Sequence, residues 1–370
     1  MSAALRTPLC DRLGIEVPIV QAPIGSASTP ELVAAVAEAG ALGVLALTWV
    51  SVDEAVRRVR CVRELTDRAF GVNLVLAFPI AGLLDACLDE GVPIVSTFWG
   101  DPDAASDRIH AGGALHLHTI GTADEGRRAV DAGVDVVVAQ GWEAGGHVTG
   151  RVTTTALTPA VVDAVAPVPV IAAGGIGDGR GLAAVLMLGG QAAWLGTRFL
   201  TTTEASTHDV YRRRVLESSG EDAVHTGCFD GGWPNAPHRA LINSTTADWE
   251  EAGSPPAPTR PGEGAVVATA SDGRTFLRYD DMIPLRGMEG DLEAMALCRP
   301  VRRARPHERP CCRDRHCAHG RSDSGASDVS VTIDTAGVRQ RAAGPFISIR
   351  VLRRGYAGAV LSALQRHDEG

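Results

Sequence analysis

Residues 17–40 read VPIVQAPIGSASTPELVAAVAEAG and contain one complete strand–loop–helix unit. The first seven residues, VPIVQAP, form a short apolar run that predicts a buried strand. Thr29 is a favourable N-cap residue, and Pro30 suits the first position of the helix that follows. Gly40 is placed to end that helix. The stretch therefore predicts a strand that is connected through a short loop to a helix.

The same order of strand, helix and glycine recurs along the chain up to residue 200. Seven further apolar runs lie at residues 42–47, 70–76, 92–100, 114–120, 134–141, 168–175 and 192–200. Strands that are apolar on both faces and alternate with helices predict a parallel α/β sheet. Eight such units are the number that closes a (β/α)8 TIM barrel, which is the fold we expect. An open, doubly wound sheet of eight strands is the structural alternative.

Composition excludes several classes of protein. The 370 residues are 45% hydrophobic and 21% charged, which excludes an intrinsically disordered or fibrous chain. The formal net charge of −9 argues against a nucleic-acid partner or an anionic membrane surface. The sequence has no apolar run long enough for a membrane helix, and its first residues do not resemble a signal peptide. We therefore expect a cytoplasmic protein whose partners are small molecules; no oligomeric state is predicted.

Glycines follow the seventh and eighth predicted strands, at the edge where barrel enzymes place their functional groups. Gly174 and Gly175 precede a helix that begins near Asp178, while Gly196 and Thr197 follow the next strand. Backbone N–H groups and a helix N-terminus converge there, which predicts a phosphate site. The segment GGIGDGRG lacks the spacing of a dinucleotide fingerprint, so a Rossmann site is excluded.

His147 is the candidate catalytic residue. It follows two glycines in the loop of residues 143–150, just past the end of the sixth predicted strand. Glycine lets the backbone approach a ligand closely, and imidazole is chemically suited to act as a general base. From spacing alone, a solvated or supporting histidine is the alternative interpretation.

Six segments in order resemble the nitronate monooxygenase family, formerly called 2-nitropropane dioxygenases. They are PIVQAPIGSASTPELVAAVAEAGALGVL, GVNL, VVAQGWEAGGHVTG, VIAAGGIGDGRG, LGTRF and GDLEAMAL, and they span about residues 10–297. The resemblance implies a TIM barrel that holds FMN without a metal and oxidises alkyl nitronates with O2 to a carbonyl compound and nitrite. The alternative is an FMN-dependent enoyl-thioester (enoyl-ACP) reductase, which has a similar barrel and takes electrons from a nicotinamide.

The resemblance also implies individual roles. His147 is implied as the catalytic group, either as the base that removes an α-proton or as a donor that stabilises the nitronate anion. The implied flavin-ring and ribityl contacts are Ala22, Pro23, Asn73, Gln140 and Gly145. The implied phosphate contacts and their neighbours are Gly174, Gly175, Trp194, Leu195, Gly196 and Thr197.

Further residues are weaker candidates for the substrate pocket. Aromatic side chains at strand ends either line the pocket or pack the barrel rim: Phe98, Trp99, His118 and Trp142. Glu143 is either a partner of His147 or a solvated loop acid. We divide the chain into the FMN-binding barrel (1–204) and a cap that shapes the substrate pocket (205–297), with Asp230, Trp233 and Pro234 as cap residues that would reach the ligand.

Residues 298–370 are interpreted as an aberrant, poorly ordered tail that arises from a frameshift. The family likeness stops at GDLEAMAL, and a stretch rich in Cys and Arg follows. Its cysteine spacing matches no common zinc site. All 35 basic residues of the chain are Arg, which indicates a GC-rich gene in which a shifted frame meets few stop codons. A damaged barrel with weak flavin binding and little activity is therefore a second functional hypothesis.

Overall fold

The computed structural model describes residues 5–297, 330–334 and 348–352. Eight parallel strands form one sheet in the order β1-β9-β8-β6-β5-β4-β3-β2. A bridge between Val20 and Leu42 joins the two outer strands, so the sheet closes into the expected (β/α)8 barrel. The strands are β1 (Ile19–Gln21), β2 (Gly43–Ala46), β3 (Phe70–Val75), β4 (Ile94–Phe98), β5 (Leu115–Ile120), β6 (Val136–Gln140), β8 (Val170–Ala173) and β9 (Ala192–Leu195).

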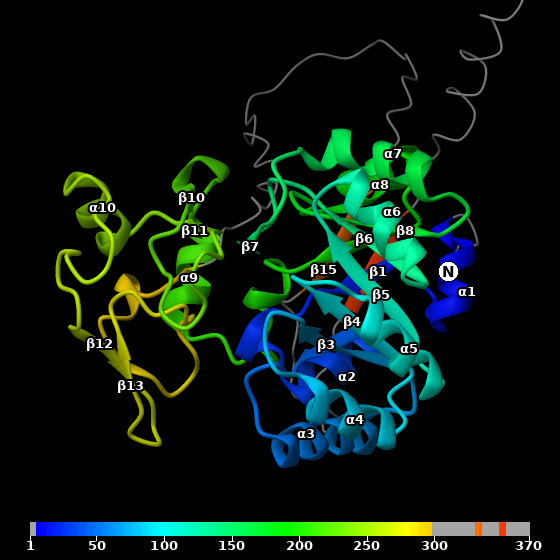
Figure 1. Ribbon diagram of the computed structural model, residues 1–370, viewed down its shortest axis with the longest axis horizontal. Helices are drawn as coiled ribbons and strands as arrows, with labels where there is room; N and C mark the ends of the chain where they lie inside the picture. The colour runs from blue at the N-terminus through cyan, green and yellow to red at the C-terminus, as the bar shows by residue number, and fades with distance from the viewer. Residues whose placement is uncertain (1–4, 298–329, 335–347, 353–370) are drawn as a thin grey trace, which may run out of the picture.

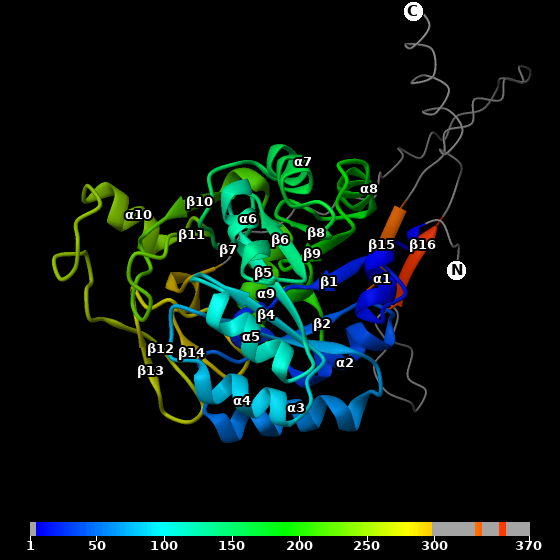
Figure 2. The same ribbon diagram turned by 45° about the vertical axis from the view of Figure 1, so that its right-hand side comes forward.

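Helices connect these strands and surround the barrel (Figures 1 and 2). They are α2 (Pro30–Glu38), α3 (Val52–Leu65), α4 (Ala81–Asp89), α5 (Asp103–Ala111), α6 (Ala123–Asp131), α7 (Thr154–Val165) and α8 (Gly179–Met187). As predicted, the Thr29 side chain caps α2 by accepting from the N–H of Leu32, and Gly40 follows the helix with a φ of +84°. A short additional helix, α1 (Pro8–Leu13), precedes β1.

The predicted strand 192–200 is too long at its carboxyl end. Strand β9 stops at Leu195, and the chain turns into a short 3-10 helix, η3 (Phe199–Thr201). The N–H of Phe199 donates to the carbonyl oxygen of Gly196 across this turn. Apolar character continues through Phe199 and Leu200 because both side chains are buried, not because the backbone stays extended.

A second group of elements follows the barrel and lies beside it (Figure 1). Its elements are α9 (Asp209–Glu217), η4 (Gly220–Asp222), β10 (Ala223–Thr226), β11 (His238–Leu241), α10 (Ser244–Glu251), β12 (Val266–Thr269), β13 (Thr275–Leu277), β14 (Glu289–Gly290) and η5 (Leu292–Ala294). We call residues 205–297 the cap. A two-residue strand from the barrel loop, β7 (Gly146–His147), pairs with β11, so one small sheet joins barrel and cap.

The cap is also fixed to the barrel by apolar contacts. Tyr211 of α9 is fully buried in a cluster with Ala27 and Leu200 of the barrel and Leu297 of the cap. The N–H of Leu241 donates to the carbonyl oxygen of Leu297. The cap is therefore packed against the barrel up to the last residue of the described segment 5–297. The exact boundaries at 204 and 297 stay predictions.

Two short strands are described within the expected tail. β15 (Ser330–Asp334) and β16 (Ser348–Leu352) pair in antiparallel register. The remainder of residues 298–370 lies outside the described residues, and the frameshift interpretation stays a prediction.

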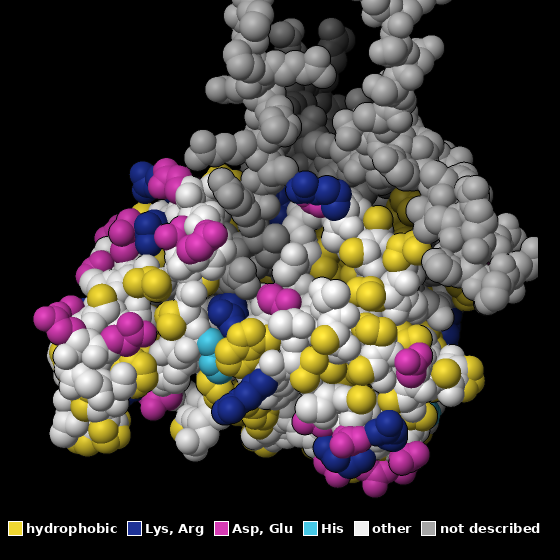
Figure 3. All heavy atoms as spheres, turned by 90° about the horizontal axis from the view of Figure 1, so that it is seen from above, with side chains coloured by type: hydrophobic (Ala, Val, Ile, Leu, Met, Phe, Trp, Pro, Cys, Tyr) yellow, Lys and Arg dark blue, Asp and Glu magenta, His cyan; other side chains and the backbone are white. Residues whose placement is uncertain are grey.

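On the face seen in Figure 3, acidic and arginine side chains are interspersed. Within the described segments, no helix is both long and apolar enough to cross a bilayer.

Gly43 fixes the distance between β2 and α2. A Cβ added there would stand 2.4 Å from the backbone oxygen of Val33 and 2.8 Å from its Cα. We expect Gly43→Ala to lower the free energy of unfolding by about 1–3 kcal/mol, because backbone cannot yield as a side chain can. Urea denaturation would measure this. Gly227→Ala is the matched control, since nothing lies within 4 Å of its added Cβ; equal losses in both variants would contradict the prediction.

Candidate active site

His147 lies on β7, between the barrel and the cap. Its Nδ1 is 2.7 Å from the carbonyl oxygen of Ala236, and its Nε2 is 2.8 Å from Oδ2 of Asp281. Both partners belong to the cap, although the loop that carries His147 leaves the barrel strand β6. The orientation of the candidate catalytic ring is therefore set by cap residues.

Asp281 is a carboxylate that the sequence analysis did not single out. Its backbone N–H donates to the carbonyl oxygen of Gly231, which holds it in the cap. Burial opposes its ionisation, but the hydrogen bond to His147 and the electrostatic effects of His147 and His238 outweigh burial, so the pKa of Asp281 is lowered from its ordinary value. Asp281 is therefore an anion at neutral pH.

A second histidine faces this pair from β11. His238 is opposite His147 in the strand register, and their ring centroids are 5.1 Å apart. The side chain is buried, and within the described part of the chain neither of its ring nitrogens has a hydrogen-bond partner. Burial, with a smaller contribution from His147, lowers the pKa of His238 to about 4, so this ring is neutral.

An aromatic wall lies on one side of His147; it is formed by Trp99 and Trp233, which contact the ring, and by Trp49 and Phe78, which pack against Trp233. Trp233 of the cap is its centre: its ring lies 4.1 Å from His147, 5.0 Å from Trp99 and 5.3 Å from Phe78. Trp49 closes the group at 5.8 Å from Trp233, and half of its surface is exposed. The wall supplies an apolar surface next to the hydrogen-bonded pair His147 and Asp281.

Trp99 has an unusual backbone conformation within that wall. Its φ is +59°, a left-handed value that bulky residues rarely adopt and that costs about 1–3 kcal/mol. Such strain persists only where the surroundings fix the residue, and it is commonest at functional sites. The conformation places the indole 5.9 Å from the His147 ring.

The predicted cofactor residues mostly follow four neighbouring strands. Strands β1, β9, β8 and β6 are consecutive in the sheet. At their ends, the N–H of Ala22 donates to the carbonyl oxygen of Leu195, and a Cβ added at Gly196 would stand 3.6 Å from that of Ala22. The ends of these strands therefore bring together Ala22, Pro23, Gln140, Gly174, Gly175, Trp194, Leu195, Gly196 and Thr197, with Gly145 in the loop after β6. Asn73 lies on β3, apart from this row, and its Nδ2 donates to Ser96.

The residues present fit a flavin in two respects. Gln140 donates through Nε2 to the carbonyl oxygen of His147, while its Oε1 is buried with no partner in the described segments. A buried acceptor without a donor is costly, and a flavin ring or ribityl hydroxyl would supply that donor. Gly174 and Gly175 have φ values of +111° and +68°, which side chains other than glycine rarely adopt, so the turn before α8 is built on two glycines.

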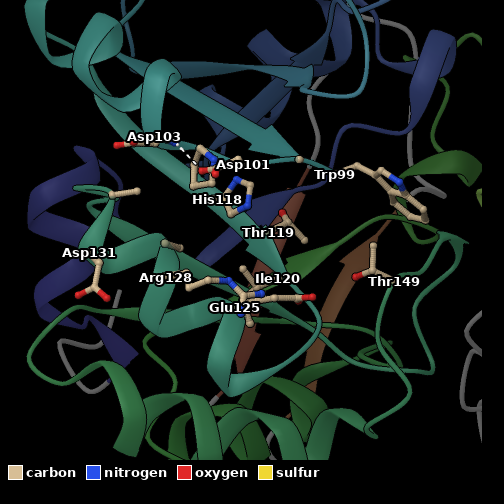
Figure 4. A pocket seen from close by; sticks show the side chains of 14 residues that line it. Trp99, Asp101, Asp103, His118, Thr119, Ile120, Glu125, Arg128, Asp131 and Thr149 are labelled. Carbon is tan, nitrogen blue, oxygen red and sulfur yellow. Dashed lines mark hydrogen bonds between the residues drawn. The ribbon is translucent and has the colours of Figure 1, made fainter.

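A cavity of about 500 Å3 adjoins the site (Figure 4). It lies between α5 and α6, and Trp99 and Thr149 form its border with the His147 loop. His118 faces it from β5, together with Arg128 and Glu125 of α6. Neither His147 nor the predicted cofactor residues line this cavity; its link to the site is through Trp99 and Thr149.

His118 is mainly part of a buried network. Thr97 Oγ1 lies 2.7 Å from Nδ1 of His118 and 2.7 Å from Nε2 of His116. Burial lowers the pKa of His118 to about 4 and that of His116 to about 3, so neither ring is a cation at neutral pH. The histidines hold β4 and β5 together, and His118 also borders the cavity.

Three weaker candidates have identifiable partners. Glu143 accepts hydrogen bonds from the N–H and Oγ1 of Thr154 at the start of α7, so it orders that helix terminus. Trp142 stacks near His225 and Arg239. Asp230 forms an ion pair with Arg260. Of the cap candidates, Trp233 is the one whose contact with His147 is established by ring geometry.

The profile of the nitronate monooxygenase family matches residues 6–85 and 79–270, which is more than half of the chain. The chain belongs to the nitronate monooxygenase family. Members with different names are similar to it at comparable identity, so family membership alone does not fix the substrate.

Two curated relatives illustrate that range. The (3aS,4S,5R,7aS)-5-hydroxy-7a-methyl-1-oxo-octahydro-1H-indene-4-carboxyl-CoA dehydrogenase of Mycobacterium tuberculosis is 41% identical over 240 residues, covering 64% of this chain and 66% of the relative. The chain therefore spans just under two thirds of that relative. The nitronate monooxygenase of Paraburkholderia phytofirmans is 35% identical over 297 residues, covering 67% of this chain and 80% of the relative.

Solved structures show the same family fold. FabK from Thermotoga maritima is 36% identical with a TM-score of 0.62, covering 67% of this chain and 80% of that chain. Nitroalkane oxidase from Streptomyces ansochromogenes is 34% identical with a TM-score of 0.61, covering 68% of this chain and 83% of that chain.

Proposed function

We propose that this protein is an FMN-dependent oxidoreductase that converts an alkyl nitronate and O2 to a carbonyl compound and nitrite. The proposal rests on the contact between Gln140 and His147 at the C-terminal ends of the barrel strands. Gln140 Nε2 donates to the carbonyl oxygen of His147, and its buried Oε1 has no donor among the described residues. Membership of the nitronate monooxygenase family and the names of two relatives support the same chemistry.

The proposed cofactor residues are those that meet at the ends of β1, β9, β8 and β6. Ala22, Pro23 and Gly145 would lie against the ring, with Gln140 and Asn73 as hydrogen-bonding groups. Gly174, Gly175, Gly196 and Thr197 would bind the phosphate, with Trp194 and Leu195 beside them. Bound FMN would supply the electron acceptor and the reaction with O2. His147 would orient and stabilise the substrate anion next to it.

One experiment tests this function. The purified protein is examined for a flavin absorption spectrum and then mixed anaerobically with ethylnitronate or NADH. We expect flavin reduction by ethylnitronate. Reduction by NADH alone would favour the enoyl-thioester reductase, and absence of bound flavin after reconstitution with FMN would favour the damaged barrel. The cytoplasmic location and the absence of nucleic-acid and membrane partners stay predictions.

A second candidate function is favoured by the aromatic wall. Four aromatic side chains offer more apolar surface than a short nitronate would cover. The relative from Mycobacterium tuberculosis is named for a bicyclic carboxyl-CoA substrate. Dehydrogenation of a ring-bearing acyl-CoA thioester by the same flavin site is therefore the alternative, and anaerobic flavin reduction by an alicyclic carboxyl-CoA would reveal it.

The wall predicts a preference for substrates with rings. We expect Trp233→Leu to lower the ratio of kcat/KM for cyclohexyl nitronate over ethylnitronate by about two- to tenfold, since an aromatic contact contributes about 0.5–1.5 kcal/mol beyond burial. Steady-state kinetics with both nitronates would measure it. Trp249→Leu is the control, because Trp249 lies on α10 and its Nε1 donates to the carbonyl oxygen of Pro255, outside the aromatic wall. An unchanged ratio in Trp233→Leu would contradict the prediction.

A further inference from the structure

A chain of buried hydrogen bonds runs from α5 to the cavity between α5 and α6. Oγ of Ser106 on α5 lies 2.6 Å from Nδ1 of His116. Oγ1 of Thr97 lies 2.7 Å from Nε2 of His116 and 2.7 Å from Nδ1 of His118, so it joins the two rings. All four side chains are buried. The chain ends at His118, which lines the cavity (Figure 4).

The protons of this chain have one order that leaves none of them unpaired. Burial lowers the pKa of both rings, so each ring is neutral and carries one proton. In that order Ser106 donates to Nδ1 of His116, and Nε2 of His116 donates to Thr97. The hydroxyl of Thr97 in turn donates to Nδ1 of His118. Each of the three contacts then holds one proton.

The other orders leave a buried hydroxyl proton without an acceptor. If Thr97 donated to His116, this ring would carry its proton on Nδ1 and donate to Ser106. The hydroxyl proton of Ser106 would then have no acceptor among the described residues. If both rings donated to Thr97, the hydroxyl proton of Thr97 would be the unpaired one. An unpaired buried donor is costly, so the first order is favoured.

The favoured order places the proton of His118 on Nε2. Nδ1 is the acceptor from Thr97, and a neutral ring has only one proton. Nε2 makes no hydrogen bond to any residue that the structure describes, although His118 is only 4% exposed. His118 therefore presents a nearly buried N–H donor to the cavity.

The other lining residues restrict the chemistry of a ligand. Four of them are carboxylates and one is a guanidinium: Asp101, Asp103, Glu125, Asp131 and Arg128. The excess of negative charge disfavours an anionic ligand. Carboxylates only accept hydrogen bonds, so a matching ligand also carries a donor. An uncharged carboxamide supplies an acceptor oxygen for His118 and N–H donors for the carboxylates, and a cavity of about 500 Å3 is large enough for such a small molecule.

We propose that the cavity between α5 and α6 binds an uncharged carboxamide, whose carbonyl oxygen accepts a hydrogen bond from Nε2 of His118. Thr97 and Ser106 are positioning residues, because they act through the His118 ring. This site is separate from the proposed flavin chemistry, since neither His147 nor the predicted cofactor residues line the cavity. Carboxamide binding therefore does not require oxidation of a nitronate.

A matched pair of ligands tests the charge of the site. N-acetylalaninamide and N-acetylalanine differ only in whether the terminal group is a carboxamide or a carboxylate. The purified full-length protein is titrated with each, and binding is followed by saturation-transfer NMR of the ligand. We expect N-acetylalaninamide to bind about fivefold more tightly, because the lining carboxylates repel the anion. Absence of binding by the amide, or equal or tighter binding of the acid, would overturn the proposal.

Two pairs of variants test the donor. His118→Leu removes the N–H, whereas His118→Gln keeps a side-chain N–H. Thr97→Val removes the hydroxyl that orients His118, whereas Thr97→Ser keeps it. We expect about two- to tenfold weaker binding of N-acetylalaninamide in His118→Leu and Thr97→Val, the usual contribution of one hydrogen bond, and smaller losses in the two matched variants. Wild-type affinity in His118→Leu would overturn the proposal.

A spectrum of the wild type tests the order of the protons directly. Nitrogen NMR of histidine-labelled protein distinguishes the two neutral tautomers, and His118→Gln assigns the His118 signal among the 11 histidines. We expect the Nε2–H tautomer, and the Nδ1–H tautomer would overturn the proposal. If His118→Leu does not fold, this spectrum and the pair of ligands still decide. None of these results depends on flavin reduction by ethylnitronate, so failure of the proposed function would be seen separately.

Discussion

His147→Gln is expected to lower kcat/KM for an alkyl nitronate by about 10²–10⁴-fold, the usual contribution of a positioned acid–base group. Glutamine retains a side-chain N–H that can donate to the Ala236 carbonyl, but its amide cannot act as an acid or a base. The carbonyl oxygen of residue 147, to which Gln140 donates, remains in place. Steady-state oxygen consumption measures the rate, and flavin absorbance measures cofactor content.

The control for this variant is His110→Gln. His110 lies on α5 and forms an exposed contact with Asp135, away from the aromatic wall. We expect it to retain wild-type kcat/KM. Activity of His147→Gln within threefold of wild type, at equal flavin content, would remove His147 from the proposed chemistry.

Arg260→Leu is expected to lower the stability of the cap by about 1–3 kcal/mol, because the buried side chain loses its hydrogen bonds to Asp230, Glu263 and the Cys228 carbonyl. The Arg260 side chain is only 7% exposed and pairs with both Asp230 and Glu263. Its guanidinium also lies 4.1 Å from the centroid of the Tyr279 ring, two residues before Asp281. The change should therefore loosen the carboxylate that holds His147.

Hydrogen exchange resolved by segment would measure this effect. We expect faster exchange in residues 223–297 of Arg260→Leu, with little change in the barrel strands. Arg274→Leu removes an exposed ion pair instead and should cost no more than about 0.5 kcal/mol. Equal exchange in Arg260→Leu and wild type, or uniform acceleration across the whole chain, would contradict a local role for Arg260.

The barrel could be predicted because each of its strands is marked by a short apolar run in the local sequence. Apolar runs such as residues 134–141 and caps such as Thr29 are determined by neighbours in the sequence, and closure requires only their number. Strand ends were less certain: Phe199 and Leu200 are apolar because they are buried in a 3-10 turn, and a short apolar run does not distinguish that from a strand.

Only those site residues that belong to the barrel could be predicted from the sequence. Glycines after β8 and the His147 loop follow strands directly, so their position at one edge follows from the fold. Asp281 is 134 residues from His147, in a segment with no recurring pattern, and its pairing depends on cap packing. His238 carried a faint signal, since it follows WPNAP, whose tryptophan was a cap candidate. Neither spacing nor composition identifies such a non-local pair.

The pairing of β7 with β11 joins two parts of the chain that have different parts in the proposed site. The proposed flavin seat belongs wholly to the barrel, whereas the partners of His147 belong to the cap. A chimaera that replaces residues 223–297 with the equivalent segment of another family member would change the partners of His147 and keep the proposed flavin-binding residues. Diversification of reactions within such a family then requires no change to the barrel.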